Sequence, residues 1–181
     1  MLPDRVHYGC GPHIIEGWLN VDMAGPHIKE ENLCKTFCVD LAHRHPFPDG
    51  WFQWGYSQYF LQRLFQPEAI LFLYECHRTF RVGGVLRISL PSMIGAMLHW
   101  FSNTDSRTVE HALWSGYEQW RSKCYWSEVG LQQVAEHIGF SVSFAAYGES
   151  SHHELTGIDT RSHLKKVSMF IELTKQKGGT D

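Results

Sequence analysis

The chain has 181 residues, about the length of one domain, and its content of 43% hydrophobic and 14% aromatic residues is enough for a full core. The formal net charge of −3 and the pI of about 6.4 argue against a general attraction to nucleic acid. Asp4 and Arg5 stand where the apolar core of a signal peptide would begin, and the longest apolar run is too short to cross a bilayer. The five cysteines lack the spacing of a disulfide framework. We therefore expect a cytoplasmic protein without a membrane partner.

Segments with strand character recur along the whole chain and alternate with segments of helical character. The expected strands cover residues 5–8, 19–22, 35–39, 51–57, 85–90, 140–147 and 166–173. The segment 85–90 is almost continuously apolar, which is typical of a buried parallel strand. This order predicts an α/β fold with a doubly wound, mostly parallel, seven-stranded sheet. The last two strands have no helix between them and fit an antiparallel edge.

The clearest helix signals follow the fourth strand. Pro67 and Glu68 favour the first turn of a helix, and apolar residues then recur at helical spacing up to Gly83-Gly84, where we expect the helix to end. Further helices are expected over 58–65, over most of 93–126 and over 128–138. We assign residues 1–174 to a single domain and expect the tail 175–181 to be disordered.

The most informative motif follows the first strand. Val6 begins a short segment that runs into the G-x-G pattern of Gly9 and Gly11, and the second strand ends in a carboxylate, Asp22. Glycines let the backbone turn sharply and let a ligand approach bare N–H groups. A carboxylate at the tip of the next strand can accept hydrogen bonds from a ribose diol. The pattern predicts an α/β nucleotide site; a plain turn at the glycines and a capping role for Asp22 are the alternatives.

Further motifs, in the same order along the chain, resemble those of the class I S-adenosylmethionine (SAM)-dependent methyltransferases, especially a compact bacterial branch of the methyltransferase-11 type. The matching segments are Tyr8-Gly9-Cys10-Gly11, 17–22, Val39-Asp40-Leu41, 46–49, 75–88, Gly148-Glu149-Ser150, Gly157-Ile158-Asp159 and 168–172. The resemblance implies a Rossmann-like fold and a biosynthetic transferase that uses SAM as its cofactor and releases S-adenosylhomocysteine.

The resemblance also implies roles for individual residues. The cofactor-binding residues that it implies are Tyr8, Gly9, Cys10 and Gly11 at the methionine end, Asp22 and Met23 at the ribose, Asp40 and Leu41 at the adenine, and Ser57 at the sulfonium. Asp40 could instead be a turn residue. Glu75 and Arg78 also match the family, but their i, i+3 spacing favours a structural ion pair.

The chain departs from the family pattern at two places. Pro12 and His13 stand where a third glycine is usual, and proline removes one N–H donor. After the fourth strand the branch usually has Ser-Glu-His-x-x-Glu-His, whereas this chain has Ser-Gln-Tyr-Phe-Leu-Gln-Arg over residues 57–63. Because that segment borders the expected reaction centre, two alternatives stay open: a SAM-using cyclase or lyase with a non-methylating outcome, and a non-catalytic SAM-binding module. A Rossmann dehydrogenase fits the motifs less well.

Methyl transfer requires that the acceptor is aligned with the methyl group and that water is excluded, and it often requires a base. Tyr59 is our first candidate for contact with the acceptor, with a packed core tyrosine as the alternative, and His13 is the second catalytic candidate. The remaining substrate-binding candidates are Ser92, His99, His111 and Trp114, from the segment 91–130 that we interpret as an acceptor lid. We expect a small-molecule or sugar-like acceptor, and the many aromatic residues would suit a homodimer contact.

Residue types that bind metals occur in two places. Cys34, Cys38, His43 and His45 form one group, but Cys38 should lie in a strand, and His152-His153-Glu154 form the other. Adjacent histidines in a strand point to opposite faces and cannot share an ion, whereas in a loop they could. Exposed loop residues are the simpler interpretation of both groups. We therefore expect no metal.

Overall fold

The computed structural model describes residues 3–23, 25–26, 28–92, 95, 117–118 and 121–177. The strands are β1 (Arg5–Tyr8), β2 (Leu19–Asp22), β3 (Thr36–Cys38), β4 (Phe52–Gln58), β5 (Phe80–Pro91), β6 (Phe140–Phe144) and β7 (Ser168–Lys175). The α-helices are α1 (Glu30–Leu33), α2 (Gln66–Thr79) and α5 (Glu128–Ile138), and the 3-10 turns are η1 (Leu61–Arg63), η3 (His153–Leu155) and η4 (Ser162–Leu164).

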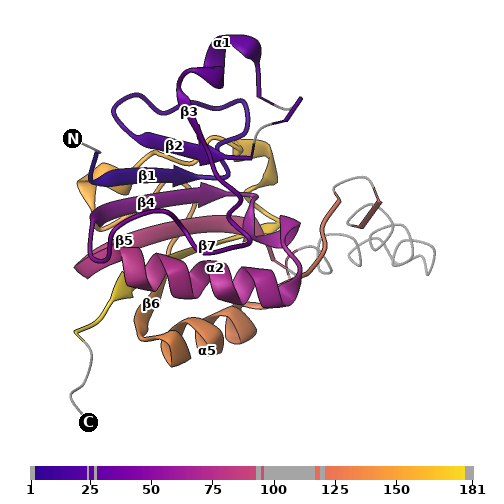
Figure 1. The fold of residues 1–181 in the computed structure, drawn as a ribbon. Helices are drawn as coiled ribbons and strands as arrows, with labels where there is room; N and C mark the ends of the chain where they lie inside the picture. The colour runs from indigo at the N-terminus through magenta and orange to yellow at the C-terminus, as the bar shows by residue number, and fades with distance from the viewer. Residues whose placement is uncertain are drawn as a thin grey trace, which may run out of the picture.

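The seven strands form one sheet in the order β3-β2-β1-β4-β5-β7-β6 (Figure 1). The first five strands in this order pair in parallel, whereas β7 runs antiparallel to both β5 and β6. The predicted mostly parallel sheet with an antiparallel edge is therefore confirmed. Residues 9–18, which join β1 to β2, form turns and no helix.

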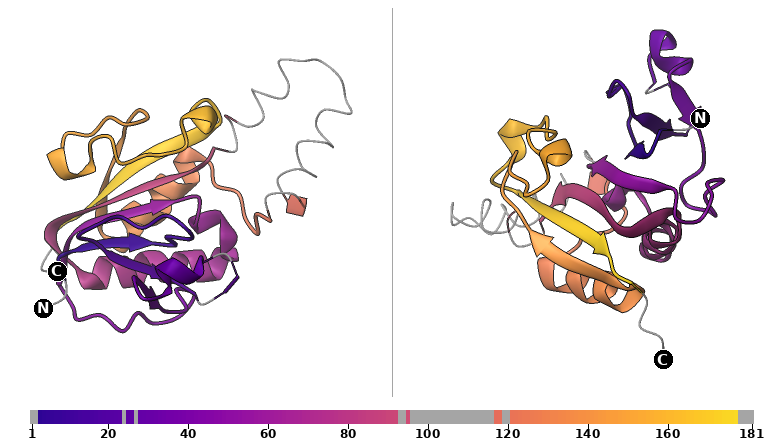
Figure 2. Two further views of the ribbon diagram at one scale, coloured as in Figure 1. Left: turned by 90° about the horizontal axis from the view of Figure 1, so that it is seen from above. Right: turned by 90° about the vertical axis from the view of Figure 1, so that its left-hand side faces the viewer.

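The two faces of the sheet are covered differently. Helices α2 and α5 lie on one face, and the segment 145–167 between β6 and β7 crosses the other, as Figure 2 shows. Because side chains alternate along a strand, Val6 and Tyr8 of β1 join the apolar core, while His7 faces the other way. Part of that second face is built from polar residues that are nevertheless buried, among them His7, Asn20 and Arg87.

Helix α2 begins as predicted but ends earlier. It starts at Gln66, and the carboxylate of Glu68 accepts the N–H of Phe65 at 2.8 Å. The helix ends at Thr79 rather than at Gly83-Gly84, because Phe80 adopts extended backbone and pairs with Phe52 of β4. The prediction that Gly83 and Gly84 end the helix is thus wrong. Both glycines lie in an irregular stretch of β5, where the register against β4 shifts.

Helix α5 agrees with its prediction at both ends. The hydroxyl of Ser127 accepts the N–H of Gly130 at 3.0 Å at the start, and Gly139 ends the helix with a φ of 111°. Among the later strands, β6 is shorter than predicted, and β7 extends to Lys175, the first residue of the expected disordered tail. The ammonium of Lys175 donates to the carbonyl of Phe80 at 2.9 Å, which ties this end of β7 to β5.

Candidate functional site

A cleft of about 680 Å³ lies where β1, β2 and β4 end. Its volume falls within the range of ligand sites, and the carboxyl ends of parallel strands are where open α/β sheets bind ligands. The lining residues are His7, Gly9, Cys10, Gly11, Pro12, His13, Ile14, Ile15, Asp22, Met23, Tyr56, Gln58, Tyr59, Phe60, Arg63, Arg121, Lys123, Thr160 and Arg161. Seven of the predicted site residues, from Gly9 to Tyr59, are thus brought together.

Asp22 holds the glycine turn in place. Its carboxylate accepts the N–H of Gly11 at 2.7 Å through Oδ2 and the N–H of Met23 at 2.7 Å through Oδ1. The turn itself needs glycine, because Gly9 and Gly11 have φ values of 63° and 53°. The carboxylate at the end of β2 and the turn after β1 therefore form one unit in the wall of the cleft.

The two glycines face different surroundings. A Cβ at Gly9 would lie 2.4 Å from the ring of Phe60, whereas a Cβ at Gly11 would meet nothing within 4 Å. Gly9 is thus required by the close approach of an aromatic side chain from the segment after β4. Gly11 leaves open space, which is the property expected where a ligand approaches the backbone.

Four of the predicted cofactor residues do not line the cleft. Tyr8, Ser57 and Leu41 are buried, and Asp40 accepts the N–H of Ala42 and contacts the ring of His43, both at 3.0 Å. Tyr8 packs edge-on against Phe72 in the core, and its burial raises the pKa of its hydroxyl far above the ordinary value.

Strand alternation explains which side chains reach the cleft. Tyr8 and Ser57 are partners in the β1–β4 register and face the helices, whereas the preceding partners, His7 and Tyr56, line the cleft. Their rings lie 5.2 Å apart between centroids. Sequence reasoning missed both residues, although the alternation along β1 was the signal that could have found them.

His7 is a neutral imidazole in the cleft wall. Its Nδ1 lies 3.2 Å from Oδ1 of Asn20, an oxygen that also accepts the N–H of Ile15 at 2.9 Å. Because that oxygen is an acceptor, Nδ1 of His7 carries the proton and Nε2 is the acceptor nitrogen. Burial is the main cause that lowers the pKa of His7 to about 4.

Tyr59 lines the cleft, but its hydroxyl is engaged. Ser168 Oγ donates to the carbonyl of Leu164 at 2.7 Å, so Tyr59 donates its proton to the same Ser168 oxygen. Burial raises the pKa of Tyr59. The guanidinium of Arg161 lies over its ring, 5.0 Å from the centroid. Tyr59 also has a φ of 55°, which is strained for a residue other than glycine.

The other predicted residues are placed as follows. The side chain of His13 is exposed at the rim of the glycine turn. Ser92 is buried outside the cleft lining, where its hydroxyl accepts the N–H of Gly95 at 2.9 Å. His99, His111 and Trp114 lie outside the described residues.

Two ion-pair clusters tie distant segments of the structure together. The predicted Glu75–Arg78 pair is present at 2.6 Å, and Arg78 also donates to the carbonyls of His45 and Phe47, which fixes the loop before β4 to α2. The second cluster, around the fully buried Arg87, was not predicted. Arg87 pairs with Asp159 at 2.6 Å and with Glu172 at 2.8 Å.

Within the described residues, no group of three or more His, Cys, Asp or Glu side chains is arranged to hold a metal ion. No helix in the same part of the chain combines the length and the apolar character needed to span a membrane.

Comparison with solved structures identifies the fold. A chain of the complex between the Haloferax volcanii Trm112 methyltransferase activator and a methyltransferase superposes with a TM-score of 0.65 and 13% identity, covering 96% of this chain and 82% of that one. A SAM-dependent methyltransferase from Mesorhizobium loti gives a TM-score of 0.64 and 13% identity, covering 94% of this chain and 90% of that one.

A third solved structure, about half of which is covered by this chain, has the same fold. Haemonchus contortus phosphoethanolamine N-methyltransferase 2, in complex with SAM, gives a TM-score of 0.60 and 11% identity, with 96% of this chain and 48% of that one covered. No protein-family model matches the sequence, and no curated protein matches it. The chain therefore has the fold of the class I SAM-dependent methyltransferases.

Proposed function

We propose that this protein is a SAM-dependent methyltransferase that acts on a small-molecule or sugar-like acceptor. The observation that carries the proposal is the position of Asp22 and the Gly9–Gly11 turn. In a fold shared with SAM-dependent methyltransferases, they line one cleft at the carboxyl ends of β1 and β2.

The residues present fit the cofactor. The open space at Gly11 lets a ligand approach the backbone closely, and Asp22 is a carboxylate in the cleft wall that suits ribose hydroxyls. When bound, SAM supplies a methyl group activated by the positive sulfonium. The protein has to position the acceptor in line with that methyl group and keep water away.

Few carboxylates that could act as a base line the cleft. Asp22 is the one carboxylate among the residues that line the cleft, and the amides of Gln58 and Gln62 stand where the family branch has acids. Gln58 accepts the hydroxyl of Thr160 at 2.6 Å. If the acceptor needs a base, His7 with its acceptor Nε2 and the exposed His13 are the candidates, while Tyr59 orients the acceptor through its ring and hydroxyl.

Product analysis tests the proposal against its alternatives. The full chain is incubated with SAM and a panel of hydroxyl- and amine-bearing small molecules, and the adenosyl product is identified by mass spectrometry. Methyl transfer predicts S-adenosylhomocysteine. Methylthioadenosine as the product would instead support a non-methylating cyclase or lyase, and tight SAM binding without turnover would support a binding module.

A further inference from the structure

Three guanidinium groups meet at one end of the cleft. Arg63 is the last residue of η1, Arg121 precedes α5, and Arg161 precedes η4. These segments are far apart in the sequence, so their cations are brought together only by the fold. Lys123 also lines the cleft, but its ammonium lies over the ring of Phe65, 4.4 Å from the centroid.

These arginines differ from the structural arginines of the chain. Arg78 and Arg87 each form ion pairs with carboxylates, whereas none of the three cleft arginines has a carboxylate partner among the described residues. Partial burial, followed by repulsion from Arg161 and Arg121, lowers the pKa of Arg63. Clustered cations without a counter-charge repel one another, and an anion between them would relieve that repulsion.

Backbone strain occurs at the same place. Among the described residues, Tyr59 and Arg121 are the two non-glycine residues with positive φ, 55° and 51°, and both line the cleft. Strain of this kind persists only where the surroundings hold it, and it gathers at ligand sites. Tyr59 also fixes Arg161 through the ring contact at 5.0 Å.

A second, smaller cavity adjoins the main cleft at two of these arginines. It measures about 260 Å³ and shares Tyr59, Arg63 and Arg161 with the main cleft. Its other lining residues are Gln62, Pro91, His163 and Leu164, so it does not border the glycine turn or Asp22. Its volume lies below the usual range of whole-ligand sites and suits one substituent of a ligand.

We propose that Arg63, Arg121 and Arg161 bind a phosphate group carried by the methyl acceptor. This inference rests on the proposed function, because it assigns a substrate class to the acceptor end of the same cleft. Planar guanidinium groups bind phosphate and carboxylate oxygens through paired hydrogen bonds, and three converging positive charges favour the doubly charged phosphate. The phosphate would lie where the small cavity meets the main cleft, because Arg63 and Arg161 line both and Arg121 lines the main cleft. The rest of the acceptor would extend past Tyr59 toward the cofactor.

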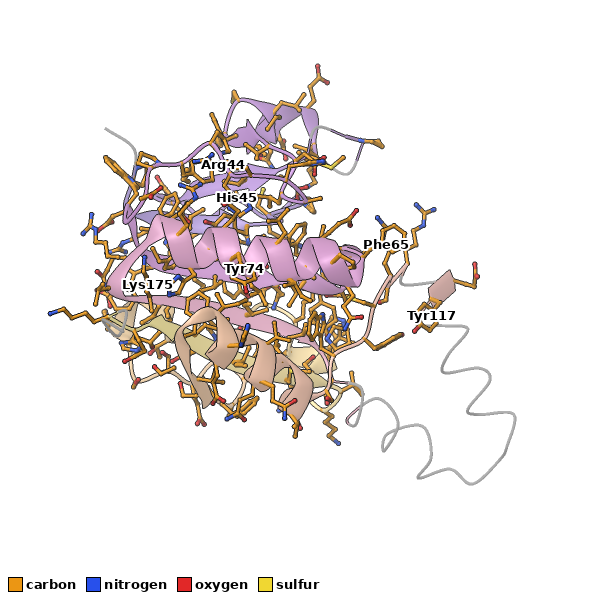
Figure 3. The ribbon with its side chains drawn as sticks, turned by 60° about the horizontal axis from the view of Figure 1, so that its bottom comes forward. Arg44, His45, Phe65, Tyr74, Tyr117 and Lys175 are labelled. Atoms are coloured by element: carbon orange, nitrogen blue, oxygen red, sulfur yellow. The ribbon has the colours of Figure 1, made fainter. Side chains whose placement is uncertain are left out.

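Calorimetry on the full chain tests the proposal. Inorganic phosphate and acetate are titrated at constant ionic strength, with and without S-adenosylhomocysteine. Phosphate should bind more tightly than acetate, and Arg63→Gln and Arg161→Gln should each weaken phosphate binding about tenfold or more, since hydrogen bonds to charged groups are lost. Arg44→Gln is the matched control, because Arg44 is exposed and lies outside both cavities. Arg44 also stands well apart from Phe65, the residue at the start of α2 whose ring contacts Lys123 of the cleft (Figure 3).

Each result bears on the assignment. Equal phosphate affinity in the arginine variants and the wild type, or tighter binding of acetate than of phosphate, would overturn it. S-adenosylhomocysteine binding should be unchanged in both variants. If the wild type binds S-adenosylhomocysteine but not phosphate, this inference fails and the proposed function stands. If it binds phosphate but not S-adenosylhomocysteine, the proposed function fails, and the assignment to an acceptor fails with it.

Discussion

At the scale of single residues, the cleft depends on a few contacts that cross between segments. Asp22 accepts two backbone N–H groups of the turn and strand end, Phe60 packs on Gly9, and Tyr59 joins Ser168 to Arg161. A single small substitution would remove each of these contacts. Single variants can therefore separate ligand binding from folding.

The first prediction concerns Asp22. Hydrogen bonds from two ribose hydroxyls to a carboxylate are worth roughly 1.5–3 kcal/mol each, so Asp22→Ala should weaken S-adenosylhomocysteine binding at least about tenfold. Because Asp22 also holds Gly11, thermal unfolding of the variant serves as the control. A folded Asp22→Ala variant with wild-type affinity would remove Asp22 from the site.

Gly9 gives a second prediction. Gly9→Ala should lower the free energy of unfolding more than Gly11→Ala does, since both have positive φ but only the methyl group at position 9 would meet the ring of Phe60, at 2.4 Å. The expected difference is about 1–3 kcal/mol, the usual cost of overpacking. Urea unfolding of the two variants measures it, and equal losses would show that Phe60 does not rest on Gly9.

Tyr59 allows an orienting role to be told from a proton-abstracting one. Its hydroxyl donates to Ser168, and its pKa is raised, so it is a poor base at neutral pH. We expect Tyr59→Phe to lower turnover roughly tenfold, the worth of one hydrogen bond, without changing the pH profile or the affinity for S-adenosylhomocysteine. Loss, in this variant, of the limb in which turnover rises with pH would instead assign Tyr59 as the base.

At the scale of elements, local signals were predicted well and long-range partners were not. Helix α5 was predicted at both ends, because Ser127 and Gly139 cap it within its own sequence. The early start of β5 was missed, because Phe80 pairs with Phe52, which lies far away in the chain. The arginines of the cleft were missed for the same reason: nothing near Arg63 in the sequence indicates that Arg161 lies beside it.

The buried Arg87 connects β5 to β7 and to the segment that carries Arg161. It donates to Asp159, Glu172 and the carbonyls of Ala146 and Glu149, with distances of 2.6–3.2 Å. An arginine in the middle of an otherwise apolar strand was the signal for this cluster. The cluster fixes the start of the segment that brings Thr160 and Arg161 to the cleft.

Removal of this arginine should be costly. Arg87→Met would leave the carboxylates of Asp159 and Glu172 buried without their cation, and we expect the free energy of unfolding to fall by about 3–5 kcal/mol. Arg81→Met, in the same strand, breaks only a surface pair with Asp4 at 3.9 Å and should change it by less than about 1 kcal/mol. Denaturant unfolding of the two variants tests the contrast; similar small losses in both would contradict the buried cluster.

At the scale of the whole molecule, α2 and α5 cover the core face of the sheet (Figure 1). On the second face, buried polar residues support the cleft. Among the described residues two histidines are buried, His7 on the cleft side and His45 in the core against Tyr8. Burial is the main cause that lowers the pKa of each to about 4. The folded protein therefore binds protons less well than the unfolded chain, in which histidine titrates near its ordinary value.

This difference predicts an acid-sensitive fold. The stability contributed by each neutral histidine is complete above the unfolded pKa of about 6.5 and is lost as the pH falls toward 4, at roughly 1.4 kcal/mol per pH unit. His45→Leu should remove about one proton from the pH dependence of unfolding between pH 6.5 and 4. Denaturant unfolding at several pH values measures this slope, and an unchanged slope would show that His45 is protonated in the folded protein.

The central claim is that the cleft at the ends of β1 and β2 binds the methyltransferase cofactor. Titration calorimetry of the full chain with SAM and with S-adenosylhomocysteine tests it most directly. We predict binding of each with roughly micromolar affinity, about −8 kcal/mol, and at least about tenfold weaker binding in Asp22→Ala. No heat and no thermal shift with either ligand would contradict the claim.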